Sequence, residues 1–357
     1  MTWTRREFMT TSALAAASCA VWGCASSQKK MQMPETQAPA SVLPVATPEK
    51  DYFYNHFGIT REMIDQVLGK AMSRGGQWGE LFFEHSRSGV IVLSDGKVSR
   101  GSSKVMLGMG VRCVYEEQFG YAYTESLTLE DMMRAAEAAA AIAPNVNVGS
   151  IKERTTPEFS KFYSQEICWD VFELSQAIAL LQDIEKRTRA KDPSIIKVTV
   201  SLDWHQRNVM MNTSDGVNAE DFVPRCGLSL SVVMQRGDEM QSNFDLFGTL
   251  DTLESLSSEK TKPKIDKLIN QAVARTAILF DAIQPKGGEM PVVLGGGDNG
   301  VMLHEAVGHG LEADCNRMGI SVYATQLNQR VACPDITIVD SGHVEKNYGA
   351  LNIDDEG

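Results

Sequence analysis

Residues 196–202 read Ile-Lys-Val-Thr-Val-Ser-Leu, and this stretch decides the fold class. Apolar and polar side chains alternate through it with a period of two, which is typical of a β-strand that buries one face. Residues 213–216 read Thr-Ser-Asp-Gly, a turn signal, and an alternating run follows at 228–232. Two alternating runs on either side of a turn predict an antiparallel hairpin.

Helices are expected in the sequence before and after this hairpin. Before it, four apolar residues would lie on one face of a helix: Val171, Leu174, Ile178 and Leu181. Asp192-Pro193 ends that helix, and a second long helix is expected over about 263–283. Residues 151–288 are therefore predicted to form an α+β domain.

A similar α+β domain is expected over residues 51–150. A helix should cover about 59–72 with Thr60 as N-cap, and another should begin after Thr128 and end before Pro144. Between these helices the sequence predicts four strands, at 81–85, 90–93, 105–111 and 118–123. The fold class is thus α+β, with mixed antiparallel sheets and packed helices.

Composition restricts the function classes. The chain has 357 residues with 34 basic and 46 acidic side chains, a net charge of −12, so no nucleic-acid partner is expected. None of the seven cysteines forms a C-x-x-C pair, which argues against a structural zinc knot. Cys113 and Cys226 lie in strand-like runs and should be buried.

Residues 1–24 have the organisation of an export signal. Arg5-Arg6, with Phe8 two places on, precedes an alanine-rich apolar stretch from about Thr11 to Gly23 that is too short to span a bilayer. The paired arginines resemble a twin-arginine signal, a route that carries folded proteins. We therefore expect a periplasmic or cell-envelope protein.

The end of the signal resembles a bacterial lipobox. Cys24 would be lipidated and become the new N-terminus, with Cys19 as a rival site and cleavage near Ala25, without lipid, as the alternative. Residues 25–50 are rich in Ser, Gln, Pro and Thr and should form a disordered tether. The only expected membrane contact is this lipid anchor.

A third domain is expected to begin at residue 289. A short strand should cover residues 291–294, and the glycines at 295–297 should make a tight turn into a helix capped by Asp298 or Asn299. These glycines lack the lysine of a phosphate-binding loop and the spacing of a dinucleotide fingerprint, so a phosphate site is not expected.

The helix of this third domain carries the candidate chemistry. Glu305 follows His304, and His309 lies five residues after His304. Neutral imidazoles are zinc ligands, and a neighbouring carboxylate can take a proton from water at the metal. In an ordinary α-helix, however, residues five apart point about 140° away from each other.

Two distortions would bring the histidines together. A single π-turn has i→i+5 periodicity and would return both rings to one face. Alternatively, the helix could end at Gly308, and His309 would then reach the metal from irregular backbone. The pattern alone leaves both possibilities open, along with a core helix whose histidines bind no metal.

The run from His304 to Glu312, His-Glu-Ala-Val-Gly-His-Gly-Leu-Glu, closely resembles the signature of the TldD/PmbA peptidase family. Stretches at 82–87, 95–98, 108–112, 120–123 and 353–357 also resemble the TldD branch, so the resemblance runs from about residue 60 to the end. The histidine motif is degenerate in the PmbA-like branch and intact here. The resemblance implies a TldD/PmbA-like fold and a Zn²⁺-dependent metallopeptidase acting on unstructured or leader-type peptides.

The resemblance also implies roles and partners. His304 and His309 would be metal ligands, Glu305 the general base, and the chain part of a homo- or hetero-dimer with a TldD/PmbA-type subunit. The peptide substrate would bind as an added strand.

The family's third ligand is a cysteine nearer the C-terminus than this sequence reaches, so the domain at 289–357 is expected to be incomplete. Cys315 is expected to be structural and His343 a surface loop residue. We therefore expect residues 51–357 alone to bind zinc weakly. The alternative function is a non-catalytic peptide-binding subunit or an inactive fragment.

Overall fold

The computed structural model describes residues 51–145, 147–158, 162–163, 174–250, 256–297, 299–341 and 347–357. The expected export signal and tether, with Cys19 and Cys24, lie outside these residues, as does His343. No helix in the described part of the chain combines the length and apolar character that crossing a membrane requires.

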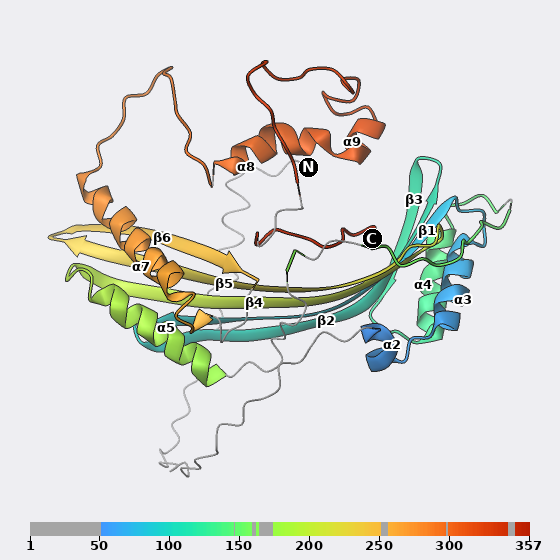
Figure 1. Cartoon of the computed structure of the whole chain (residues 1–357), viewed down its shortest axis with the longest axis horizontal. Coiled ribbons are helices and arrows are strands. Elements are labelled where there is room, and N and C mark those ends of the chain that lie inside the picture. Colours follow the sequence, from blue (N-terminus) through green and yellow to red (C-terminus); the bar gives the residue numbers. More distant parts are fainter. Residues whose placement is uncertain are drawn as a thin grey trace, which may run out of the picture. The chain divides into compact units, whose positions relative to one another are not determined.

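The described strands form one antiparallel sheet in the order β3-β2-β1-β4-β5-β6 (Figure 1). Their bounds are β1 (Trp78–Ser94), β2 (Lys97–Tyr115), β3 (Gln118–Thr124), β4 (Ile195–Thr213), β5 (Asn218–Arg236) and β6 (Glu239–Thr249). The expected α+β class is confirmed. The central pairing of β1 with β4 joins strands from residues 51–150 and 151–288 into a single sheet.

Strand β1 corrects one expectation, because the two strands expected at 81–85 and 90–93 are a single strand of 17 residues. Its middle, Ser86 to Gly89, has little apolar character but is paired on both sides, with β2 and β4. Gly89 is required there, since a Cβ atom would lie 2.0 Å from the Trp204 ring.

In the described part of the chain, helices cover one face of the sheet in two groups. Helices α3 (Arg61–Met72) and α4 (Leu129–Ala140) pack in a cluster with Leu81 and Phe83 of β1. Helices α5 (Leu174–Arg189) and α7 (Lys262–Ala277) pack in a second cluster with Ile91 and Leu93. All four β1 residues are odd-numbered, so both groups lie on the same face. A short helix, α2 (Tyr52–Phe57), joins the first group through Phe53.

Sequence predicts two helix N-caps correctly and one strand face incorrectly. The Thr60 and Thr128 hydroxyls accept hydrogen bonds from the N–H groups of Met63 and Asp131, as expected of N-caps. Ile196, expected on the buried face of its strand, is 46% exposed, while Ile195 is buried. The register of β4 against β5 shifts between Ile195 and Lys197, so Ile196 is the extra residue of a β-bulge.

The opposite face of the sheet holds residues 347–357. Ile353 packs against Val209, Met211 and Ala219 there. Asn352 donates its Nδ2 hydrogen to Asp221 Oδ1 at 3.0 Å, and the hydroxyl of Tyr163 donates to the other oxygen of the same carboxylate. A buried polar network therefore fixes this segment to the sheet.

The short strand expected at 291–294 is not formed. These residues are irregular, and Val293 is 97% exposed. No described strand pairs with them, and an isolated apolar segment has no partner for its backbone hydrogen bonds.

Candidate metal centre

A change of helix type places the two histidines. Helix α8 (Gly300–Leu303) continues as a π-helical turn, η3 (His304–Gly308), and then as a 3₁₀ turn, η4 (His309–Leu311). The His309 N–H donates to the carbonyl of His304, an i→i+5 hydrogen bond. The π-turn is therefore the distortion that occurs. Asn299 precedes the helix but does not cap it; its side-chain amide donates to the Gly295 carbonyl instead.

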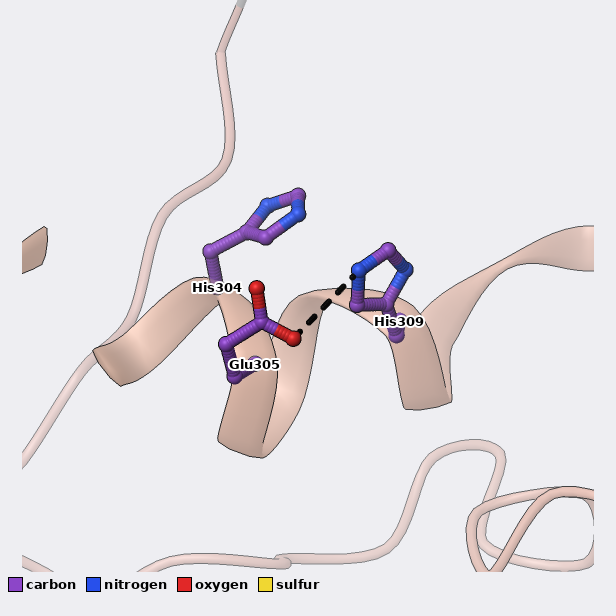
Figure 2. A group of neighbouring side chains, drawn as sticks. All are labelled: His304, Glu305 and His309. Atoms are coloured by element: carbon purple, nitrogen blue, oxygen red, sulfur yellow. Dashed lines mark ion pairs between the residues drawn. The ribbon is translucent and has the colours of Figure 1, made fainter. Parts of the chain in front are cut away.

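The π-turn brings the side chains of His304, Glu305 and His309 together (Figure 2). The two imidazole centroids lie 4.4 Å apart with their planes at 69°. One potential ligand atom from each of the three residues lies within 4.8 Å of the others. The rings therefore have the separation expected of two ligands that share one metal ion, since each zinc–nitrogen bond is about 2.1 Å.

The two nitrogens of His309 face different carboxylates. Nε2 lies 3.6 Å from Oε2 of Glu305, and Nδ1 lies 2.6 Å from Oε1 of Glu312. The hydrogen bond to Glu312 is the main cause that raises the pKa of His309, and the charges of Glu312 and Glu305 act in the same direction. The sequence alone assigns Glu312 no role. The spacing could have indicated a contact, because Glu312 is three residues after His309 and residues three apart are neighbours on a helix surface.

The turn after His309 is braced by the segment that follows it. The Gly310 carbonyl accepts hydrogen bonds from Asn316 Nδ2 at 3.0 Å and Ser321 Oγ at 2.5 Å. The Tyr323 ring packs directly against Gly310. Short helix α9 (Ala313–Arg317) begins just after Glu312 and supplies Asn316. His309 therefore leaves its helix through a defined turn.

The donor set fits a divalent metal such as zinc. Two imidazoles and a carboxylate converge, and all three side chains are exposed in the described part of the chain. Imidazole nitrogen and carboxylate oxygen are both established zinc ligands. His304 and His309 could therefore hold the metal, with Glu305 beside it.

Cys315 lies near this centre, in a second group with Glu312 and Asp314 whose potential ligand atoms also lie within 4.8 Å of one another. Desolvation, followed by the charges of Asp314 and Glu312, raises the pKa of its thiol. The thiolate form that binds metals is therefore disfavoured. Cys113 and Cys226, expected to be buried, are buried.

Comparison with known families gives three adjacent matches. Residues 79–143 match PmbA/TldA metallopeptidase domain 1, residues 169–280 the central domain, and residues 287–357 the C-terminal domain. The π-turn lies within the last of these.

Sequence relatives carry metalloprotease names. The chain is 32% identical over 287 residues to the metalloprotease TldD homolog of Haemophilus influenzae, covering 78% of this chain and 59% of the relative. It is 29% identical to the TldD homolog of Buchnera aphidicola, covering the same shares. The chain thus spans about three fifths of the length of these curated relatives.

Solved structures share the fold. A putative modulator of DNA gyrase from Thermotoga maritima matches with a TM-score of 0.65 and 16% identity, covering 83% of this chain and 65% of that one. TldE from Thermococcus kodakarensis matches with a TM-score of 0.56 and 15% identity, covering 74% and 58%. At these identities the comparison concerns the fold alone.

Proposed function

The chain belongs to the PmbA/TldD metallopeptidase family, and from this premise we propose that it is a zinc metallopeptidase that hydrolyses unstructured or leader-type peptides. His304 and His309 are the proposed metal ligands and Glu305 the proposed general base. The observation that carries the proposal is the π-turn, which brings the three side chains together from a spacing that an ordinary helix would keep apart.

Each residue has a separate task in this proposal. A bound zinc ion supplies a Lewis acid and lowers the pKa of water at the site. His304 and His309 hold the metal through neutral imidazole nitrogens. Glu305 follows the first ligand and lies 3.6 Å from Nε2 of the second, so its carboxylate is placed to accept a proton beside the metal.

The proposed substrate is an extended peptide that binds as an added strand. The described sheet has two outer strands, β3 and β6, and an exposed strand edge offers backbone donors and acceptors to another chain. Main-chain hydrogen bonds give affinity with little sequence preference, which suits unfolded substrates.

Two further proposals concern the surroundings of the enzyme. We propose that it works as a homo- or hetero-dimer with a TldD/PmbA-type subunit. We also propose that it is exported by the twin-arginine route and anchored by lipid at Cys24, which would put the site in the periplasm or cell envelope.

The test separates metal binding from catalysis. With the full chain, His304→Ala and His309→Ala should each weaken zinc binding by about 100-fold, because each removes one ligand. Glu305→Gln keeps the side-chain shape and should leave the zinc dissociation constant nearly unchanged. It should lower cleavage of an unstructured peptide by about 100-fold or more, the usual contribution of a general base.

Two results would overturn the proposal. Undiminished zinc binding by both histidine variants would refute the proposed metal site. Zinc and peptide binding through these residues, without any cleavage by the dimer or by the chain alone, would instead identify a non-catalytic peptide-binding subunit.

A further inference from the structure

Glu312 contacts the nitrogen of His309 that faces away from Glu305. Its Oε1 lies 2.6 Å from Nδ1, whereas Glu305 lies near Nε2. We propose that Glu312 is a positioning residue that keeps the hydrogen of the neutral His309 ring on Nδ1 and leaves the Nε2 lone pair free for the metal. The inference rests on the proposed function, because it concerns the same metal centre.

The chemistry of imidazole explains why this contact matters. A neutral ring carries one N–H and one lone pair, and only the nitrogen with the lone pair can bind a metal. An ionised carboxylate is an acceptor only, so a short contact with Nδ1 requires the hydrogen on that nitrogen. Carboxylates that accept a hydrogen bond from a ligating histidine fix its tautomer and ring orientation.

The backbone at Glu312 turns its side chain toward the ring. Glu312 lies between η4 and α9 with φ −56° and ψ 132°, so the helix is interrupted at this residue. Its carbonyl accepts hydrogen bonds from the N–H of Asn316 at 3.1 Å and from Asn316 Nδ2 at 2.8 Å. Asn316 also donates to Gly310, so one side chain fixes both ends of the turn between His309 and Glu312.

A direct metal contact for Glu312 fits this geometry poorly. In an imidazole ring the lone-pair directions of Nδ1 and Nε2 point to different sides, so one ion cannot bind Nε2 and also lie beside the carboxylate at Nδ1. Glu305 is on the Nε2 side and Glu312 on the other. Glu312 therefore acts through His309.

The experiment measures the tautomer and the zinc affinity separately. Nitrogen-15 NMR of histidine-labelled, metal-free full chain at alkaline pH reports which ring nitrogen of His309 carries hydrogen. Wild type should show it on Nδ1, Glu312→Ala should lose that preference, and zinc binding should weaken about 10- to 100-fold. Glu312→Gln should keep the preference and lose less affinity, because its amide oxygen can still accept the hydrogen bond.

Asp314→Asn is the matched control. It removes the same charge two residues away, and the Asp314 carboxylate bonds the N–H of Cys315 rather than His309. Zinc binding should change less than about threefold, since the lost charge belongs to an exposed side chain and is screened by solvent. An equal loss in Asp314→Asn and Glu312→Ala would show a charge effect and overturn the proposal.

Further outcomes are equally decisive. Persistence of the Nδ1–H tautomer in Glu312→Ala would overturn the positioning role. Equal loss of zinc in Glu312→Gln and Glu312→Ala would indicate a direct ligand and overturn it as well. His309→Ala distinguishes failure of the proposed function from failure of this inference. Zinc affinity that is unchanged in His309→Ala refutes the metal centre itself. Zinc affinity that falls in His309→Ala but not in Glu312→Ala refutes only this inference.

Discussion

Gly308 leaves the space that the imidazole of His304 occupies. A Cβ atom at position 308 would lie 3.3 Å from Nδ1 of His304, closer than ordinary van der Waals contact. Gly308 has φ −55° and ψ −57°, which any residue can adopt. The glycine therefore provides side-chain space at the candidate metal centre and is not required for backbone freedom.

Gly308→Ala should have opposite effects on stability and zinc binding. Alanine in a helical segment should raise the free energy of unfolding by up to about 1 kcal/mol. The displaced His304 ring should weaken zinc binding several-fold. Gly300→Ala is the control, because nothing lies within 4 Å of a Cβ atom there; it should leave zinc binding unchanged. Urea unfolding and zinc titration measure the two effects, and unchanged zinc affinity in Gly308→Ala would contradict the argument.

Gly310→Ala should be more disruptive. A Cβ atom there would lie 2.5 Å from Cε2 of the Tyr323 ring, so either the ring or the turn after His309 must move. Overpacking of this kind typically costs about 1–3 kcal/mol. We expect zinc affinity to fall further than in Gly308→Ala. Combining Gly310→Ala with Tyr323→Ala removes the clash and should recover affinity relative to Gly310→Ala; failure to recover would exclude the ring contact as the cause.

Sequence periodicity predicts most of the sheet because alternation reports burial directly. Residues 198–202 keep their expected faces. Ile196 does not, since a bulge inserts a residue without any local compositional mark. The length of β1 was also missed, because Ser86 to Gly89 are held by pairing with neighbours on both sides and not by apolar alternation.

At the candidate site, the sequence proposes residues but leaves their geometry open. Spacing shows that His304 and His309 need a distorted helix, yet it leaves a π-turn and a helix end as alternatives. The i→i+5 hydrogen bond from His309 to His304 decides between them. Glu312 could not be assigned because its role depends on which ring nitrogen it meets, a matter of side-chain orientation.

Asn352→Ala should destabilise the protein by about 1–3 kcal/mol, the usual cost of leaving buried polar partners unsatisfied. The side chain donates to Asp221 at 3.0 Å and accepts from the N–H of Phe162 at 2.8 Å, and it is buried. Asn347→Ala is the control, because its side chain accepts an exposed bond from the Gly349 N–H; it should change stability by less than about 0.5 kcal/mol. Equal urea midpoints for the two variants would contradict the buried-network argument.

Glu80 should make stability fall as pH rises toward neutrality. Its side chain is buried, Oε1 has no hydrogen-bond partner among the described residues, and only Arg112 pairs with the other oxygen, at 3.0 Å. Burial raises the pKa of Glu80 to about 7, although Arg112 opposes the shift.

The sign of the effect follows from proton binding. Between the unfolded pKa of about 4.3 and the folded pKa, the folded state holds a proton that the unfolded state has lost, so the free energy of unfolding decreases as pH rises. Glu80→Gln removes this term. Relative to wild type, the variant should therefore gain stability between about pH 4.5 and 8, by at most about 4 kcal/mol. Urea unfolding at several pH values measures the difference, in which the contribution of His309 cancels.

Glu84→Gln, which removes a more exposed carboxylate paired with Arg207, is the control and should show no such gain. A wild-type-minus-variant difference that stays flat over this range would place the Glu80 carboxyl in its ordinary ionised state and refute the prediction.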